Sequence, residues 1–244
     1  TTLFEGDLSG DALEGTLSEG EVAGAFNLRR AEAPPRVKMR PTMFSNGDVT
    51  LAGELLLPET GGRNPAIIFL HGSDDEGRWA SRYLARRFVE RGYVALIYDK
   101  RGVGESTGDW SVAGIEGLAA DAVEGFKFLA GQPEVDPDRI GIYGHSQGGW
   151  VVAIVASRLK SLAFVIGSAA SGLSPAETEL YSVRNSIGVE SLVPKERADA
   201  ERYVDEIVAV AYKGKSRDDL DGMAKAYASR AWYFDAPPPG TRNL

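Results

Sequence analysis

Apolar positions in the middle of the chain follow two spacings, one typical of buried strands and one typical of helices. Short apolar runs occur at residues 66–70, 94–98, 140–143 and 162–166, and such runs are typical of strands that are buried on both faces of a sheet. Between them, apolar residues recur every three or four positions, most clearly over residues 115–129. Strands that alternate with helices at this spacing predict an α/β fold with a mostly parallel central sheet and helices on both faces.

The beginning of the chain has a different pattern, in which apolar and polar residues alternate on either side of turn signals. Residues 13–17 and 23–30 predict one β-hairpin, and residues 36–44 and 49–57 predict a second. A single hairpin is barely stable by itself, so the first one is expected to belong to a separate N-terminal β domain. Ala33–Pro35 predict the boundary after it.

After the last apolar run the strands stop and helical patterns take over. Ser174, Pro175 and Glu177 have the arrangement of a helix N-terminus with a capping box. Because this helical block follows an α/β region, it is interpreted as an inserted cap.

These patterns predict four segments. They are a remnant of an N-terminal β domain with its linker (1–35), an α/β core (36–173), a helical cap (174–233) and a return toward the core (234–244).

Composition excludes several classes of function. The net charge of −8 at pH 7 argues against nucleic acid, which requires a basic face, and against anionic membrane surfaces. The chain has no cysteine, so it has no disulfide, thiol nucleophile or cysteine metal site. No apolar run is long enough to span a membrane, and no histidine and carboxylate cluster has metal-ligand spacing. We expect neither a metal nor another cofactor.

The stretch IGIYGHSQGGW at residues 140–150 carries the strongest candidate chemistry. A predicted strand runs into Gly144 and His145, and a helix is expected to begin near Gln147. Strand, sharp turn and helix, with small residues two positions before and after the serine, are the pattern of a nucleophile elbow. The helix N-terminus behind Ser146 would offer N–H groups to a developing oxyanion. Ser146 is therefore the predicted nucleophile, and a chance match to the short pattern is the alternative.

A second stretch, after the strand at 66–70, supplies the other half of the predicted site. In elbow-type acyl-transfer enzymes one oxyanion donor is the N–H after the nucleophile, here Gln147, and the other comes from this second loop. We expect the Ser73 N–H in that role, with Gly72 as the alternative. The side chain of His71 is expected to hold the loop through a hydrogen bond.

Two further candidates are interpreted as structural. Residues 102–107 contain half of a dinucleotide-binding G-x-G-x-x-G motif, but Thr107 stands where the third glycine belongs. Asp99 and Arg101 follow a predicted strand, and we expect a salt bridge there that braces the loop.

On these motifs, residues 45–170 resemble the α/β-hydrolase fold family of serine esterases and related peptidases. The motifs are HGSDDEG (71–77), YDKRGVGES (98–106), DPDRIGIYGHSQGG (136–149) and AFVIGSAASG (163–172). The chain is most similar to bacterial carboxylesterases with an N-terminal β-rich domain, and residues 1–33 are similar to the last hairpin of such a domain. The resemblance implies a small-molecule ester substrate, an acyl-enzyme intermediate and no cofactor.

The histidine base is not where the family pattern places it. In this fold the acid and the histidine follow the serine in the chain, yet the two histidines, His71 and His145, both precede Ser146. His145 is not expected to replace the base, since adjacent residues on a sharp turn point apart. Asp235 lies too early to be taken as the acid. The sequence therefore looks like a piece of a hydrolase cut at both ends, with the missing segments in a longer chain or in another one.

The sequence thus predicts a serine hydrolase that cleaves carboxylic esters, with Ser146 as nucleophile and the Ser73 and Gln147 N–H groups as oxyanion hole. An acyl-peptide or dipeptidyl peptidase, a non-catalytic binding pseudoenzyme and a fragment without function of its own remain as alternatives. The sequence leaves a homodimer open, and it leaves a bacterial cytoplasmic location open beside a secreted or periplasmic one.

Overall fold

The computed structural model describes residues 2–31 and 37–233. The chain divides into two compact units, one up to Arg36 and one from Val37 onward. The expected boundary at Ala33–Pro35, Asp235 and the expected return of residues 234–244 lie outside the described residues.

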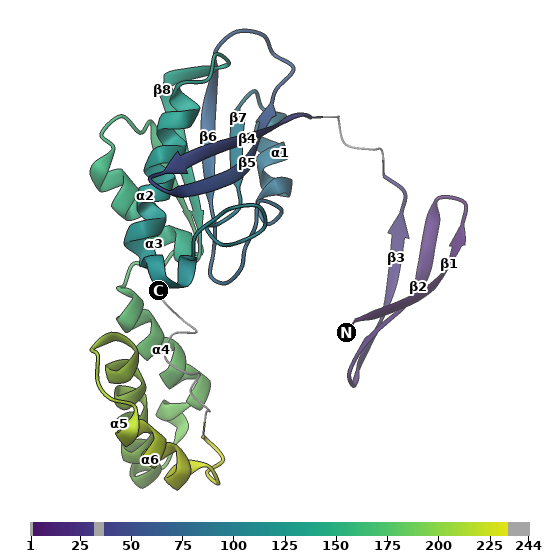
Figure 1. Ribbon diagram of the computed structural model, residues 1–244. Helices are drawn as coiled ribbons and strands as arrows, with labels where there is room; N and C mark the ends of the chain where they lie inside the picture. The colour runs from purple at the N-terminus through teal and green to yellow at the C-terminus, as the bar shows by residue number, and fades with distance from the viewer. Residues whose placement is uncertain (1, 32–36, 234–244) are drawn as a thin grey trace. The chain divides into compact units, whose positions relative to one another are not determined.

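The first unit is a three-stranded antiparallel sheet in the order β1-β2-β3 (Figure 1). Its strands are β1 (Leu3–Ser9), β2 (Ala12–Glu19) and β3 (Val22–Arg29). Gly10 and Gly20 each begin a two-residue turn with φ near +58° and +57°, a conformation that favours glycine at the first turn position of a hairpin. The predicted hairpin is confirmed as β2 and β3, and β1 adds a strand that the sequence pattern did not reveal.

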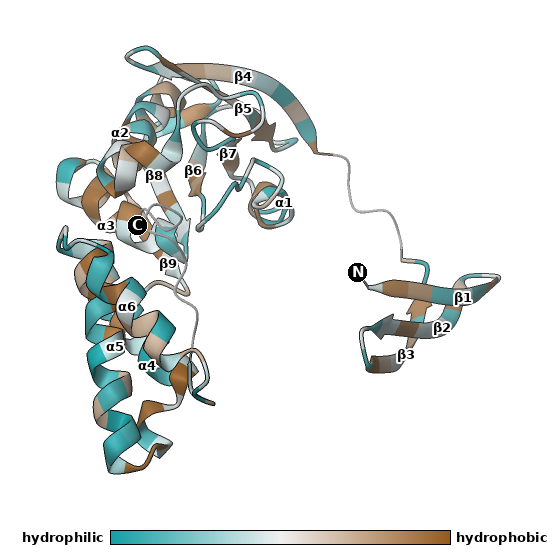
Figure 2. Ribbon diagram, turned by 60° about the horizontal axis from the view of Figure 1, so that its bottom comes forward, coloured by the Kyte–Doolittle hydropathy of each residue, from teal (hydrophilic) through white to brown (hydrophobic). Residues whose placement is uncertain are grey.

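The second unit contains a six-stranded sheet in the order β4-β5-β7-β6-β8-β9, with all six strands labelled in Figure 2. Its strands are β4 (Lys38–Asn46), β5 (Val49–Leu57), β6 (Asn64–Leu70), β7 (Val94–Tyr98), β8 (Val135–His145) and β9 (Phe164–Ser168). The pairs β4–β5 and β5–β7 are antiparallel, and the remaining pairs are parallel. This confirms the predicted mostly parallel sheet.

Helices cover both faces of this sheet, as the apolar runs predict. Along β6, Ile67 and Phe69 pack on the side of α1 (Arg82–Val89), whereas Ile68 and Leu70 pack on the opposite side. That opposite side is covered by α2 (Trp110–Ala130) and α3 (Gln147–Arg158). The central strands are continuously apolar because neither of their faces meets water.

The structure differs from the sequence prediction at the start of β8. Residues 136–139 are polar and have the sequence pattern of a turn before the apolar run at 140–143, yet β8 begins at Val135. Its register with β6 shifts here, because Asn64 is opposite Val135 and Ala66 is opposite Ile140. The polar residues 136–139 therefore form an irregularity inside the strand, of the kind that inserts residues into one strand of a pair.

The last described part is helical and has an apolar cluster of its own. Its elements are α4 (Pro175–Ile187), the 3₁₀ turn η1 (Val189–Ser191), α5 (Pro194–Tyr212) and α6 (Asp218–Tyr227). The predicted capping box is present, with the Ser174 hydroxyl accepting from the Glu177 amide and the Glu177 carboxylate accepting from the Ser174 amide. Hydrophilic residues predominate along α5 in Figure 2, and its apolar side packs in the cluster around Tyr203. Among the described helices, none has the length and apolar character needed to cross a membrane.

A buried carboxylate on α2 joins three parts of the core. Asp121 is 1% exposed; it accepts two hydrogen bonds from Arg101, at 2.5 and 2.7 Å, and one from Asn46 at 2.8 Å. Removing one partner of a buried ion pair leaves a charge without compensation. We therefore expect Asp121→Ala to lower the free energy of unfolding by about 3–5 kcal/mol.

Urea denaturation measures this loss, with Asp138→Ala as the control. Asp138 is exposed, so its replacement should change stability by less than about 0.5 kcal/mol. Equal stability of the two variants would contradict the structural role given to Asp121.

Candidate active site

Ser146 lies at a strained turn between a central strand and a helix. β8 ends at His145 and α3 begins at Gln147, so Ser146 is the one residue between them. Its φ of 51° and ψ of −114° are unfavourable for a residue with a side chain. Such strain persists only where the surroundings enforce it, and it is typical of functional sites.

Two backbone hydrogen bonds enforce the turn. The Ser146 amide donates to the Ser168 carbonyl at 2.9 Å, at the end of β9. The Gly149 amide donates to the Ser146 carbonyl at 2.8 Å. The position of Ser146 is therefore fixed by the neighbouring strand as well as by its own helix.

Three glycines make the turn sterically possible. A Cβ atom on Gly144 would lie 2.1 Å from the Gly148 carbonyl oxygen, and one on Gly148 would lie 2.7 Å from the His71 carbonyl oxygen. On Gly149 it would lie 2.4 Å from the Cβ of Ala170. These distances leave no room for a side chain, and the contact with His71 shows that the loop after β6 lies directly against the turn.

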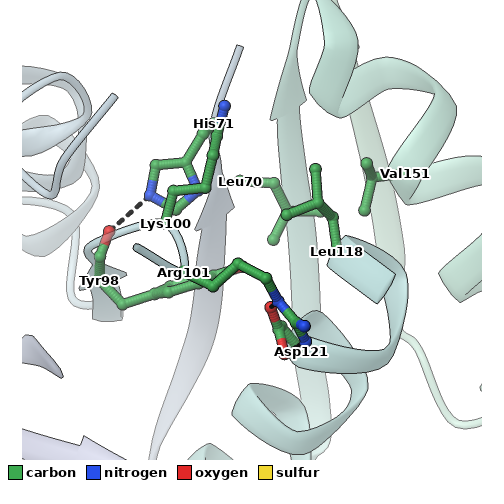
Figure 3. Close-up of a pocket in the computed structure, with 8 residues that line it drawn as sticks. All are labelled: Leu70, His71, Tyr98, Lys100, Arg101, Leu118, Asp121 and Val151. Atoms are coloured by element: carbon green, nitrogen blue, oxygen red, sulfur yellow. Dashed lines mark hydrogen bonds and ion pairs between the residues drawn. The ribbon is translucent and has the colours of Figure 1, made fainter. Parts of the chain in front are cut away.

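His71 anchors the beginning of that loop, as expected from the sequence. The ring is buried, and its Nε2 is 2.5 Å from the carbonyl oxygen of Tyr98 (Figure 3). The imidazole also meets the Tyr98 ring edge-on. Burial lowers the pKa of His71 to about 4, and the nearby Lys100 contributes to the lowering, whereas the Tyr98 carbonyl opposes it. The ring is thus neutral at pH 7, and Nε2–H donates to the carbonyl, so this nitrogen is engaged in holding the loop.

The amides expected as oxyanion donors belong to the loop after β6 and to the first residue of α3. The Gly72 amide donates to the Glu76 carboxylate at 2.7 Å, so of the two candidate amides in this loop that of Gly72 is already engaged. The Ser73 amide forms no hydrogen bond with any residue of the described ranges. Gln147 is 1% exposed and is the first residue of α3.

Lys100 connects the loop after β6 with the start of α3, and the sequence analysis did not identify it as a candidate site residue. Its Nζ donates to the carbonyl oxygens of Gly72 at 2.6 Å and Asp74 at 2.7 Å, and it lies 3.4 Å from the side-chain oxygen of Gln147. The sequence signal that could have revealed Lys100 is its place just after a buried strand. A buried charge there is costly unless it is paired or hydrogen-bonded.

Asp99 and Arg101 brace loops, but they do so with other partners rather than with each other. Asp99 pairs with Arg78 at 2.6 Å and accepts from the Glu105 amide, while Arg101 pairs with Asp121 (Figure 3). Burial alone would raise the pKa of Asp99, but the hydrogen bonds from Arg78 outweigh it and hold the pKa below its usual value.

His145 faces a different hollow from the one around His71. It is exposed and lines a cavity together with Trp79, Tyr83 and Tyr143, and Ser146 is not among the residues that line it. In the described part of the chain, no group of three histidine or acidic side chains is arranged to hold a metal ion.

The sheet order and the helices on its two faces define the class of protein: the chain is an α/β-hydrolase of the serine hydrolase class, as its motifs indicated. Residues 46–205 match the family described as X-Pro dipeptidyl-peptidase (S15 family), and the chain belongs to this family.

Curated relatives of known name include a quorum-quenching protein and an esterase. The quorum-quenching protein AidA of Acinetobacter baumannii is 32% identical over 124 residues, which cover 50% of this chain and 41% of AidA. Esterase EstD of Thermotoga maritima is 29% identical over 157 residues, which cover 59% of this chain and 37% of EstD. The chain thus spans less than half the length of these relatives.

Solved structures share the fold. The hypothetical protein PA2218 from Pseudomonas aeruginosa matches with a TM-score of 0.53 and 25% identity, over 78% of this chain and 63% of that one. The α/β-hydrolase GrgF from Penicillium sp. sh18 matches with a TM-score of 0.52 and 22% identity, over 82% of this chain and 69% of that one.

A side chain at Gly148 would collide with the backbone of the loop after β6. Gly148→Val should cost about 3 kcal/mol, at the upper end of what overpacking costs, because the added carbons meet backbone that cannot rotate away, and the protein should be insoluble or melt at a clearly lower temperature. Gly172→Val is the matched control, since no atom lies within 4 Å of a Cβ on Gly172. Thermal unfolding gives the melting temperatures of both variants. A Gly148→Val protein as stable as the control would show that the turn is not tightly packed.

The neutral state of His71 predicts a pH dependence of stability. Its pKa is about 4 in the folded protein against the ordinary value of 6.5 for histidine, so between these pH values the unfolded chain binds the proton and the folded chain does not. The free energy of unfolding should therefore fall by about 3 kcal/mol as the pH drops through this window. His71→Gln, which keeps a donor for the Tyr98 carbonyl, should lack this part of the dependence.

Urea denaturation between pH 7 and pH 4 measures the free energy of unfolding of the wild type and of His71→Gln at each pH. A difference between wild type and His71→Gln that does not change with pH would contradict a buried, neutral His71.

Proposed function

We propose that this protein cleaves carboxylic esters through an acyl-enzyme intermediate, with Ser146 as the nucleophile. The observation that carries the proposal is the strained conformation of Ser146 between β8 and α3. A serine on a sharp strand-to-helix turn presents its hydroxyl at the edge of the sheet, and this is the edge where open α/β sheets bind their ligands.

In the proposed reaction, the Ser146 hydroxyl oxygen attacks the ester carbonyl and its proton passes to a general base. The amides of Gln147 and Ser73 stabilise the negative charge that develops on the carbonyl oxygen. The base gives this proton to the leaving alkoxide. Water then attacks the acyl-serine, its proton passes through the base to the Ser146 oxygen, and the acid is released. We propose a histidine as this base, and we assign the role neither to His71, which is engaged with Tyr98, nor to His145, which lines another cavity.

Peptide cleavage is the second candidate, favoured by the description of the matching family as an X-Pro dipeptidyl-peptidase. We favour esters because the relative EstD is named an esterase, and because an ester has a better leaving group than an amide. Parallel assays with a p-nitrophenyl ester and an X-Pro p-nitroanilide distinguish the two. A protein that turns over neither, with Ser146 unreactive, is the non-catalytic binding module.

We further propose that the segments of the chain have separate tasks. Residues 36–173 would carry the reacting groups, residues 174–233 would act as a cap over the substrate, and residues 1–35 would belong to a β domain. The separate apolar cluster of α4, α5 and α6 supports a cap with an apolar core of its own.

The proposal predicts that a fluorophosphonate labels Ser146 in the full-length protein. A phosphonylated serine resembles the tetrahedral intermediate, so labelling requires both a reactive hydroxyl and the two amide donors. Peptide mapping by mass spectrometry should find the label on Ser146, and Ser146→Ala should remove it.

Ser157→Ala is the control, because Ser157 lies on the same helix and its hydroxyl donates to the Ile154 carbonyl. Labelling of this variant should equal that of the wild type. A label on another residue, or none on the wild type, would overturn the assignment of Ser146.

A further inference from the structure

We propose that Lys100 is a positioning residue for the ester hydrolysis proposed above: its buried ammonium orients the Ser73 amide toward the oxyanion. The inference rests on that proposed function, and it concerns a side chain that is 1% exposed and reaches the loop after β6 from the end of β7.

The geometry of one peptide group carries the argument. Lys100 Nζ donates to the Gly72 carbonyl at 2.6 Å, and this carbonyl belongs to the same planar peptide as the Ser73 N–H. In a trans peptide the C=O and the N–H point in opposite directions, and no described peptide is cis. Holding the Gly72 oxygen toward the ammonium therefore turns the Ser73 N–H away from it, toward the side of the peptide that Lys100 does not occupy.

The other two contacts fix the loop against the helix that follows Ser146. Nζ also donates to the Asp74 carbonyl at 2.7 Å and reaches the Gln147 side-chain oxygen at 3.4 Å. An ammonium has three donors, and all three are used on the two segments that carry the proposed oxyanion amides. One side chain thus sets the separation between Ser73 and Gln147.

The surroundings keep this ammonium away from water without pairing it directly. The ring of Trp110 lies 4.7 Å from Nζ, and the indole N–H of Trp110 donates to Asp75 at 2.7 Å. The charged groups around it are the carboxylates of Asp74, Asp75 and Glu76 in the loop, with Asp99 and Arg101 adjacent in the chain and neutral His71 at the loop's start. None of the hydrogen bonds from Nζ within the described ranges goes to a carboxylate. The ammonium therefore donates to the carbonyl oxygens of two backbone groups and one side-chain amide.

This environment gives the proposed role a pH signature. Burial lowers the pKa of Lys100 to about 8, with Glu76, Asp74 and Asp75 opposing the change. Above that pH the amine keeps fewer and weaker hydrogen bonds, and the Ser73 amide loses its orientation. Between about pH 8 and the value of 10.5 expected for the unfolded chain, the unfolded state binds more protons, so the free energy of unfolding rises with pH. Reactivity and stability should therefore change in opposite directions.

The experiment compares Lys100→Met with Lys127→Met in the full-length protein. Methionine fills the space of the lysine stem without the charge, and Lys127 is an exposed lysine on α2. At pH 7 the limiting rate of fluorophosphonate labelling should be roughly tenfold to a hundredfold lower in Lys100→Met, as when an oxyanion donor is weakened. The concentration for half-maximal rate should stay unchanged, and Lys127→Met should behave as wild type.

The pH dependence separates positioning from simple structural support. Between pH 7 and pH 9.5 the limiting rate of the wild type should fall, with a midpoint near the pKa of about 8, while its stability rises relative to that of Lys100→Met. The variant should show no such fall. A Lys100→Met protein that is labelled at the wild-type rate would overturn the inference.

If Lys100→Met does not fold, the wild-type profile decides, because a limiting rate that stays constant through pH 8 also overturns it. Slow labelling of Lys100→Met that still occurs on Ser146 supports both proposals. Absence of any label on Ser146 in the wild type would instead be a failure of the proposed function.

Discussion

The contact between the loop after β6 and the turn at Ser146 is the constraint on which the proposed site depends. β6 and β8 are parallel neighbours, so their carboxyl ends meet at one edge of the sheet. The His71 carbonyl oxygen would be 2.7 Å from a Cβ at Gly148, so a side chain there would separate the two segments. The glycine lets them meet, and the Ser73 and Gln147 amides then belong to adjoining segments.

Buried polar groups hold this contact from the side of β7. His71 is anchored on Tyr98, and Lys100 binds the loop and the helix, although burial opposes the charged form of each. An apolar core would avoid that cost but could not orient carbonyl and amide groups. Of the two, only Lys100 is buried in its charged form at pH 7, and the stability that this costs is the counterpart of a fixed loop geometry.

The sequence predicted the parts of this structure that depend on local pattern. The runs at 66–70 and 94–98 were recognisable because both faces of β6 and β7 are buried, and the Ser146 turn was recognisable from its flanking glycines. The pairing of Arg101 with Asp121 and the contacts of Lys100 were not predictable, since the partners lie 20 or more positions apart in the chain. Residues 136–139 look like a turn because they are polar, and only the pairing with β6 shows that they belong to β8.

Rapid mixing of the full-length protein with a short p-nitrophenyl ester tests the central claim, an acyl-enzyme on Ser146, most directly. We expect a burst of p-nitrophenol close to one equivalent of protein and a mass increase by one acyl group, located on Ser146. Turnover that persists undiminished in Ser146→Ala, with the acyl group absent or on another residue, would contradict it.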